Sequence, residues 1–196
     1  MRPVRLGILG SGKGTNCRAI LESIRSGALE AEVRVVISEV FDAPILDIAR
    51  EFSIPNAYLP PGQFRTRLEP EAESDLVRML RDASVELVIL AGFMRVLKSP
   101  MLDAFPRRIV NIHPSLLPKF PGLEAWKQAF VAGEKVTGCT VHYVDEKIDH
   151  GDIIARREVP ILPNDTPESL HARIQVAEHE LYPTAIGQIC RQLSTA

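Results

Sequence analysis

The sequence predicts an α/β fold: an open, mostly parallel, twisted sheet with helices on both faces and antiparallel strands in its C-terminal part. Three observations predict this class. Short apolar runs alternate with segments of helical periodicity up to residue 111, as in a parallel sheet that is covered on both faces. The first apolar run ends in a glycine-rich turn, and two β-rich segments with only a polar turn between them follow residue 135. No repeat or linker divides the 196 residues, so we expect a single domain.

The order of the elements follows from periodicity and from the residues that begin and end helices. Apolar runs predict strands at residues 4–9, 33–38, 56–59, 87–91 and 109–111. Apolar side chains at helical spacing predict helices at residues 16–26, 44–52, 71–82 and 123–132. Segments 136–144 and 153–159 are expected to pair as antiparallel strands. The last helix is expected to begin at Thr166 and Pro167, with the threonine as its cap, and to bend at Pro183.

Composition and charge narrow the classes of function. Hydrophobic residues make up 45% of the chain and charged residues 24%, so a packed core is expected. The net charge of −2 and the absence of a basic run argue against nucleic acid or an acidic membrane as a partner. No apolar run approaches the roughly 20 residues of a membrane span, and MRPVRLGIL is too short and strand-like for a signal peptide. Cys17, Cys139 and Cys190 form no CxxC pair, which favours the reducing cytoplasm over a disulfide framework or a zinc knuckle.

The stretch GILGSGKGTN at residues 7–16 is close to two phosphate-binding loops and matches neither. It fits the P-loop pattern until Gly14, which replaces the hydroxyl that holds Mg²⁺, and it fits the dinucleotide pattern until Thr15, which replaces the last glycine. Glu39, after the second strand, is a weak candidate to bind a ribose hydroxyl. A strand, a glycine turn and a helix start still place free N–H groups beside the positive end of the helix dipole. The loop predicts a metal-free site for a phosphate monoester; the alternative is a plain turn in which glycine only allows packing.

Asn111 and His113 stand two residues apart at the end of the fifth strand, so both side chains are expected on one face. Ligands of open parallel sheets bind beyond the carboxyl ends of the strands, where the glycine loop also lies. Asp149, in the turn between the antiparallel strands, could reach His113 and favour its charged form. The three groups would supply an oxyanion donor, an acid and a proton acceptor. The alternatives are a half-buried histidine that ends a strand and an acidic surface turn.

Covalent and metal catalysis fit the sequence less well. GxSxG is absent, and no serine or cysteine stands in a recognisable nucleophile setting. HExxH is also absent, because His179-Glu180 lacks the second histidine. His171 and His179 are expected at the surface or near the phosphate. Direct transfer between two bound substrates is therefore favoured.

Seven motifs together resemble one family, the phosphoribosylglycinamide formyltransferases of purine synthesis, and the resemblance spans almost the whole chain. The motifs are SGKGTN at 11–16, FRTR at 64–67, LAGFMRVL at 90–97, NIHPSLLPKFPG at 111–122, VTGCTVHYV at 136–144, DHGDII at 149–154 and AEHELYP at 177–183. The resemblance implies a formyltransferase-type, Rossmann-like fold. Its phosphate-binding half would span about residues 1–110, and its folate-binding and catalytic half about residues 111–196.

The resemblance also implies the substrates and the residues that bind them. The substrates would be glycinamide ribonucleotide and 10-formyltetrahydrofolate, used without a metal by a cytoplasmic monomer or homodimer. The residues implied for the ribonucleotide are Gly14, Thr15 and Asn16 at its phosphate, and Gln175, Val176, Ala177 and Glu178, the last near a ribose hydroxyl or the amine. The residues implied for the folate are Arg67 at the glutamyl tail, Met94, Arg95, Val96 and Leu97 at the pterin, and Asp145, Glu146, Lys147, Ile148 and Asp149 on its other side.

The implied reaction is attack of a neutral amine on the formyl carbon. Asn111 and charged His113 would stabilise the oxyanion, and Asp149 would support His113 and assist proton transfer. Alternatives remain within the superfamily. A tRNA-dependent member would need an additional basic domain, a hydrolase would usually carry a regulatory domain before the first strand, and a sugar-nucleotide enzyme would lack SGKGTN. Outside it, a nicotinamide-dependent reductase or a non-catalytic phosphate-binding module would share the sheet and the glycine loop.

Overall fold

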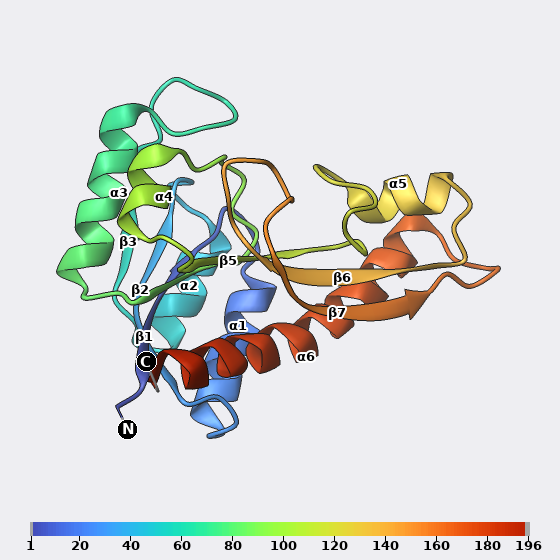
Figure 1. Cartoon of the computed structure of the whole chain (residues 1–196), viewed down its shortest axis with the longest axis horizontal. Helices are drawn as coiled ribbons and strands as arrows, with labels where there is room; N and C mark the ends of the chain where they lie inside the picture. The colour runs from blue at the N-terminus through green and yellow to red at the C-terminus, as the bar shows by residue number, and fades with distance from the viewer. Residues whose placement is uncertain (1, 195–196) are drawn as a thin grey trace.

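The computed structural model describes residues 2–194 and contains one seven-stranded sheet with the strand order β3-β2-β1-β4-β5-β6-β7 (Figure 1). The strands are β1 (Val4–Leu9), β2 (Ala31–Ser38), β3 (Asn56–Tyr58), β4 (Leu87–Leu90), β5 (Ile109–His113), β6 (Val136–Tyr143) and β7 (Ile153–Pro160). The first five strands are parallel, whereas β6 runs antiparallel to β5, and β7 runs antiparallel to β6. This topology confirms the predicted mostly parallel sheet with a C-terminal antiparallel pair.

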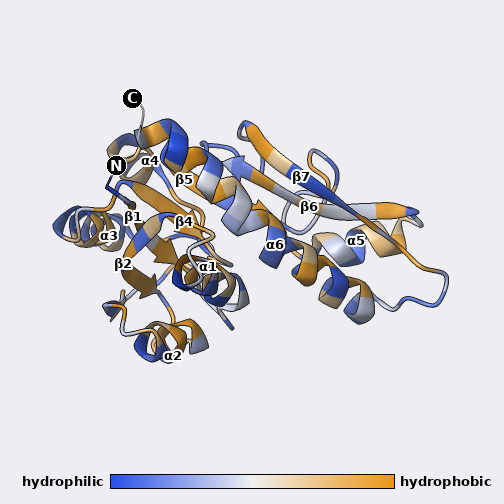
Figure 2. Cartoon of the chain, turned by 90° about the horizontal axis from the view of Figure 1, so that it is seen from below, coloured by the Kyte–Doolittle hydropathy of each residue, from blue (hydrophilic) through white to orange (hydrophobic). Residues whose placement is uncertain are grey.

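Helices cover both faces of the sheet and divide the core in two (Figure 2). The helices are α1 (Thr15–Arg25), α2 (Pro44–Glu51), α3 (Pro70–Asp82), α4 (Ser99–Ala104), α5 (Ala125–Val131) and α6 (Pro167–Ser194). Apolar side chains of α1, α2 and α6 form one buried cluster with the sheet, and those of α3 and α4 form the other. None of the helices within residues 2–194 is both long and apolar enough to cross a bilayer.

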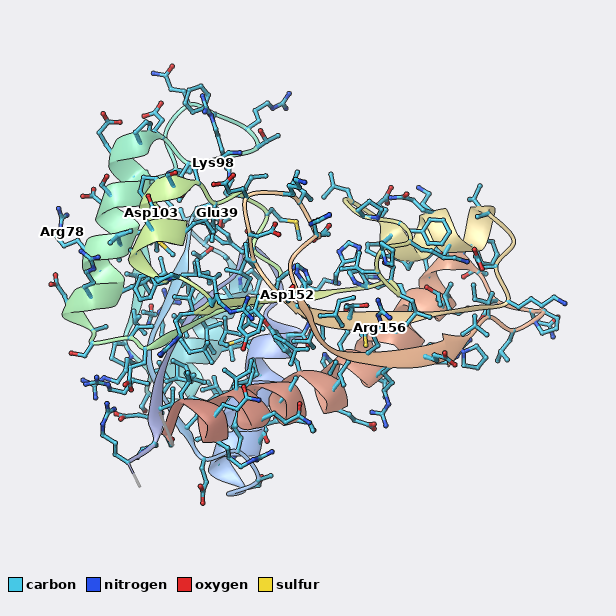
Figure 3. All side chains as sticks on the ribbon, viewed as in Figure 1. Glu39, Arg78, Lys98, Asp103, Asp152 and Arg156 are labelled. Atoms are coloured by element: carbon cyan, nitrogen blue, oxygen red, sulfur yellow. The ribbon has the colours of Figure 1, made fainter. Side chains whose placement is uncertain are left out.

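The antiparallel pair β6–β7 extends away from the parallel part of the sheet together with α5 and the first turns of α6 (Figure 1). Figure 3 shows the distance between these parts: Arg78 and Asp103 lie on α3 and α4 at one side, and Arg156 lies on β7 at the other. The 28-residue helix α6 crosses between the two parts and packs against β6, β7, α1 and α5. One helix therefore contacts both the parallel part of the sheet and the antiparallel pair.

Several elements differ from the predictions. Helix α4 was not predicted, because its six residues are too few to display a periodic apolar face. Helix α5 begins at Ala125 rather than at residue 123, because Glu124 adopts a left-handed conformation (φ 51°) at its start. Strand β5 continues to His113, so both polar side chains of the NIH motif belong to the strand. Thr166 caps α6 as predicted, accepting a hydrogen bond from Ser169 N at 3.2 Å, while the bend at Pro183 stays a prediction.

Candidate active site

The glycine loop forms a backbone cradle at the start of α1. Gly14 precedes Thr15 with φ 72°, and a Cβ atom on Gly14 would lie 2.8–2.9 Å from atoms of Ile45. Only glycine fits such a conformation and such an approach without strain. Ile45 N donates to Gly12 O at 3.1 Å, which joins the start of α2 to the loop. The first N–H groups of an α-helix have no partner within the helix, so those of α1 could bind an anion here, which stays a prediction.

Helix α6 meets this cradle through a buried side-chain contact. Asn16 Nδ2 donates to Glu178 Oε2 at 2.9 Å. Burial raises the pKa of Glu178 to about 7, and the hydrogen bond from Asn16 opposes that rise. Thr15 and Val176 line one cavity of about 730 Å³, to which Lys13 also contributes. The structure therefore brings the predicted phosphate and helix residues together.

The other two predicted residues of α6 differ in accessibility. Gln175 is half-buried, whereas the Ala177 side chain is buried in the core and leaves only its backbone for a ligand. His179 lines the same cavity, and the ring of His171 stacks on Trp126 with centroids 3.7 Å apart. Burial lowers the pKa of both histidines, so both favour the neutral form.

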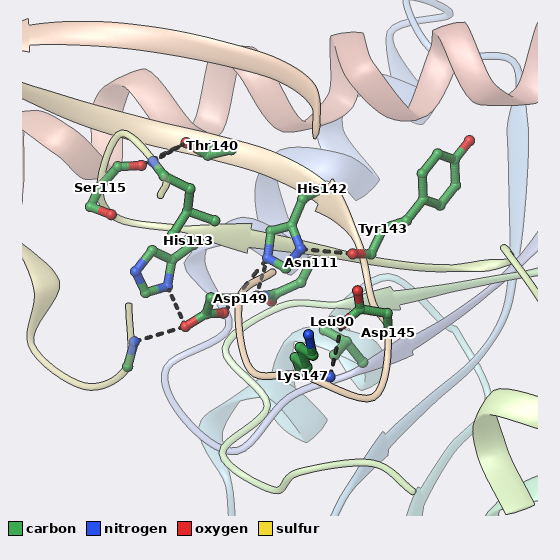
Figure 4. A network of polar contacts seen from close by, with 12 residues as sticks. Leu90, Asn111, His113, Ser115, Thr140, His142, Tyr143, Asp145, Lys147 and Asp149 are labelled. Atoms are coloured by element: carbon green, nitrogen blue, oxygen red, sulfur yellow. Dashed lines mark hydrogen bonds and ion pairs between the residues drawn. The ribbon is translucent and has the colours of Figure 1, made fainter. Parts of the chain in front are cut away.

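Asp149 holds His113 at the carboxyl end of β5 (Figure 4). Its Oδ2 lies 3.3 Å from His113 Nδ1 and accepts a hydrogen bond from Gly122 N at 2.8 Å. The other ring nitrogen of His113, Nε2, lies 2.8 Å from Phe120 O. Both nitrogens thus face oxygen acceptors, and only a doubly protonated imidazole can donate to both. The predicted contact between Asp149 and His113 is present, and the surroundings of the ring suit a cation.

His142 joins this group and was not predicted. Strands β5 and β6 pair Asn111 with His142 directly, and Asn111 Nδ2 lies 3.2 Å from His142 Nε2. His142 Nδ1 lies 2.8 Å from Tyr143 O, a contact that assigns the proton to Nδ1 and makes Nε2 an acceptor for the Asn111 amide. Burial lowers the pKa of His142, so its neutral form is favoured. This pairing depends on the register between β5 and β6, and that register cannot be read from the sequence.

The predicted folate residues after β4 lie beside the segment that contains Arg67. Arg95 Nη1 donates to Phe64 O and Arg65 O, both at 2.6 Å. Val96 forms an isolated bridge with Arg67, whose guanidinium lies 4.0 Å above the Phe64 ring centroid. Of the other two predicted residues, Met94 is exposed and Leu97 is buried in the core. The two segments therefore form one connected wall.

Glu39 does not stand free at the end of β2 as a ribose ligand would. It accepts a hydrogen bond from Ser11 Oγ at 2.7 Å and pairs with Arg95 Nε at 3.4 Å. Its side chain is only 2% exposed. This placement gives no support to a dinucleotide-type role for the carboxylate.

In the loop between β6 and β7, one acidic side chain points toward His113, and the other predicted folate residues of the loop are exposed. Asp149, with φ 53°, points toward His113, whereas Ile148 is 61% exposed and the side chains of Glu146 and Lys147 are exposed. Asp145 accepts a hydrogen bond from Lys147 N at 2.8 Å and lies 3.6 Å from His150 Nδ1. Only Asp149 of this loop enters the polar cluster. From here on we call Asn111, His113, His142 and Asp149 the catalytic cluster, after the role that the sequence predicts for three of them.

The three cysteines lie in the core rather than at the cluster. Burial raises the pKa of Cys17 and Cys139 to about 12 and that of Cys190 to about 11. Thiols with such values are inert as nucleophiles at neutral pH. Among residues 2–194, no group of three or more His, Cys, Asp or Glu side chains is arranged to hold a metal ion.

Comparison with known proteins decides the family. A family model described as formyl transferase matches residues 4–186. This chain belongs to the formyl transferase family. The relatives of this formyl transferase include the phosphoribosylglycinamide formyltransferase of Bacillus subtilis (strain 168), which is 38% identical over 94% of each chain. They also include the trifunctional purine biosynthetic protein adenosine-3 of Drosophila pseudoobscura pseudoobscura, which is 46% identical over 93% of this chain. The match spans only 13% of that longer protein.

Solved structures agree with the sequence comparison. The glycinamide ribonucleotide transformylase 1 of Symbiobacterium toebii superposes with a TM-score of 0.92 at 46% identity, covering 97% of this chain and 89% of that one. The phosphoribosylglycinamide formyltransferase of Bacillus halodurans superposes with a TM-score of 0.89 at 42% identity, covering 94% of each chain. Sequence and fold thus group this formyl transferase with the phosphoribosylglycinamide formyltransferases.

Proposed function

We propose that this formyl transferase moves the formyl group of 10-formyltetrahydrofolate to the amine of glycinamide ribonucleotide, a step of purine biosynthesis. The observation that carries the proposal is the catalytic cluster, in which a buried carboxylate holds an imidazole beside the Asn111 amide. The cluster stands at the carboxyl end of β5 and the cradle follows β1, two strands away in the same sheet, and the family of the chain transfers formyl groups. The substrates are inferred from the names of the relatives.

Two exposed apolar side chains suit a folate as the second substrate. Met94 and Ile148 are large apolar side chains with 59% and 61% exposure, and they belong to the two loops assigned to the pterin. A planar ring bound there would remove apolar surface from water. Arg67, on the segment joined to Val96, offers a cation for a glutamyl carboxylate. These features support folate binding without a metal ligand set.

The chemistry follows from these groups. The neutral amine attacks the formyl carbon, the bond from that carbon to the folate nitrogen breaks, and the proton lost by the amine is matched by one gained at the folate nitrogen. Asn111 donates one amide hydrogen to His142, which leaves its other hydrogen for the developing oxyanion. The positive charge of His113 stabilises the same oxygen, and Asp149 keeps that charge in place and accepts or relays the amine proton.

His113 requires a change of partner in this mechanism. Its Nε2 is directed at Phe120 O, and its Nδ1 is directed at Asp149. We infer that Nε2 transfers its hydrogen bond from Phe120 O to the formyl oxygen when both substrates bind. Positioning both substrates in one site supplies a further large part of the rate enhancement by proximity.

Two broader expectations accompany the proposal. Three buried, unpaired thiols suit a reducing compartment, so we place the activity in the cytoplasm. Both substrates are small molecules, and we expect either a monomer or a homodimer to suffice.

A direct assay tests the proposal. Purified protein is mixed with glycinamide ribonucleotide and 10-formyltetrahydrofolate, and folate absorbance is followed while the ribonucleotide product is identified by mass. We expect turnover only when both substrates are present. Consumption of the folate without ribonucleotide would instead indicate a hydrolase, and no folate consumption under any condition would reject formyl transfer.

A further inference from the structure

Glu39 is a buried carboxylate that the proposed chemistry does not use. It follows β2 directly, and its Oε1 lies 2.7 Å from Ser11 Oγ and 3.4 Å from Arg95 Nε. Its Oε2 is buried and has no hydrogen-bond partner within the described residues. Burying a carboxylate with one oxygen unpaired opposes folding, even when the other oxygen is bound. A role in binding or positioning would explain such a residue better than a contribution to stability.

The partners of Glu39 belong to both substrate-binding regions. Ser11 stands at the head of the glycine loop, and its Oγ accepts a hydrogen bond from Met94 N at 2.8 Å. Ser11 N donates to Gly92 O at 3.0 Å, so this residue is bound to the loop after β4 through both its backbone and its side chain. Glu39 thus stands where the cradle adjoins the loop assigned to the pterin.

Arg95 extends the same network to residues 64–67, the other segment assigned to the folate. Its side chain is 16% exposed, and its Nη1 donates to the carbonyls of Phe64 and Arg65 while its Nε faces Glu39. Val96 N donates to Thr66 O at 2.8 Å beside these contacts. The guanidinium is therefore held by Glu39 at one end and holds the segment that precedes Arg67 at the other. Loss of the carboxylate would leave Arg95 held only by the carbonyls of Phe64 and Arg65, so its side chain and this segment would be less well ordered.

We propose that Glu39 is a positioning residue for the formyl donor: it orders Arg95, and through Arg95 the segments 64–67 and 94–97, against the glycine loop. This inference rests on the proposed function, because it assigns a use to the same folate region. If these segments are already ordered in the free protein, less conformational entropy is lost when a ligand binds to them. Removing the Glu39 charge should therefore weaken binding of the donor, while the rate at saturation and the affinity for the ribonucleotide change little.

The test compares Glu39→Gln with Glu86→Gln. Glu86 also pairs with an arginine through Nε, Arg5 at 3.2 Å, but it lies beside the amino ends of the strands, away from both substrate regions. Binding of tetrahydrofolate is measured by titration calorimetry, and KM and kcat are measured for both substrates. For Glu39→Gln we expect about a tenfold rise in the Kd of tetrahydrofolate, the equivalent of one charge-assisted hydrogen bond. The ribonucleotide KM should stay within about twofold, and Glu86→Gln should leave both values unchanged.

A double variant shows whether the effect passes through Arg95. If Glu39 acts by ordering Arg95, then Glu39→Gln/Arg95→Met should bind tetrahydrofolate no more weakly than Arg95→Met alone. The double variant also removes both charges, so it reports on the pairing even if Glu39→Gln fails to fold.

The outcomes separate this inference from the proposed function. Tetrahydrofolate binding that is unchanged by Glu39→Gln, or additive effects in the double variant, would overturn the role of Glu39 alone. Equal weakening of both substrates together with a large loss of thermal stability would reduce Glu39 to a structural residue. Failure of the unsubstituted protein to bind tetrahydrofolate would reject the proposed function itself, since the calorimetry needs no turnover.

Discussion

The two ends of the candidate site are built in opposite ways. The anion cradle is backbone: a left-handed Gly14, the first N–H groups of α1 and the close approach of Ile45. The catalytic cluster is made of side chains that come from β5, from β6 and from the loop between β6 and β7. The two ends should therefore fail under opposite changes. The donors of the cradle are backbone N–H groups, which a substitution does not remove, so the cradle should be damaged only when atoms are added. The cluster should be damaged when a charge or a hydrogen-bond partner is removed.

The largest effect is expected at the cluster, from Asp149→Asn. Asparagine tolerates the φ of 53° at this position and can still accept the hydrogen bond from Gly122 N, so the fold should survive. The change removes the negative charge that faces His113 and a proton acceptor, which should lower kcat by about 10² or more. Substrate Kd values should stay within a few-fold, and the pH–rate profile should change shape. Full turnover in this variant would contradict the role given to Asp149.

Glu178→Gln examines a titratable side chain that contacts Asn16 at the start of α1. Because its folded pKa of about 7 lies above the unfolded value of 4.5, the folded protein holds an extra proton between these values. The free energy of unfolding contributed by Glu178 is thus fully present below about pH 4.5 and is lost as pH rises toward 7. Glutamine cannot titrate and can still accept from Asn16. We expect the free energy of unfolding of the variant, taken relative to that of the unsubstituted protein, to be up to about 3 kcal/mol higher at pH 8 than at pH 4.5. Urea unfolding of both proteins at the two pH values measures this difference. An equal difference at both pH values would show that Glu178 titrates normally.

Gly14→Ala should damage the cradle by adding a single carbon. The left-handed conformation and the approach to Ile45 predict a loss of about 1–2 kcal/mol in unfolding free energy and a ribonucleotide KM raised about tenfold. Gly12→Ala is the matched control, because a Cβ there meets no atom within 4 Å. Tetrahydrofolate binding, measured on both variants, should stay unchanged. Equal loss of both ligands in Gly14→Ala would instead indicate general misfolding.

The smallest effect is expected from His142→Leu. Leucine removes the acceptor that orients the Asn111 amide, which should lower kcat about five- to tenfold, in line with the loss of one neutral hydrogen bond. His142→Gln keeps an acceptor oxygen and should recover most of the loss. Steady-state rates of both variants, measured at one pH near neutrality, provide the comparison. A leucine variant with the rate of the unsubstituted protein would remove His142 from the mechanism.

The cradle and the strands could be predicted from the sequence because their signals are local. Gly14, in the glycine-rich stretch after an apolar run, indicates a tight turn before a helix, and this signal does not depend on the tertiary structure. The cluster could be predicted only in part. Asn111 and His113 share a strand, so simple alternation placed them together, and the turn between the antiparallel strands was expected to bring Asp149 within reach of His113. His142 was missed because its place opposite Asn111 depends on the register between β5 and β6, which no local pattern encodes.

Longer-range packing accounts for the remaining differences. Ala177 was expected beside the ribonucleotide with its neighbours on α6, but its side chain turns into the core. Helical geometry allows only some members of a four-residue run to face one ligand. The partners of Glu39 were likewise unpredictable, because Ser11 and Arg95 are separated from it by 28 and 56 positions in the sequence.

The hydrogen bonds of Tyr182 restrict where residues can be inserted into or deleted from this chain. Its buried hydroxyl lies 2.9 Å from Leu90 O and 3.0 Å from Val110 O, so it anchors α6 to neighbouring strands just before Asn111. Glu178 stands four residues earlier on the same helix, which is about 6 Å along its axis. An insertion of one residue between them would rotate one contact by about 100° relative to the other. Length changes between relatives are therefore expected in exposed turns such as residues 162–164, while the spacing from 178 to 182 stays constant.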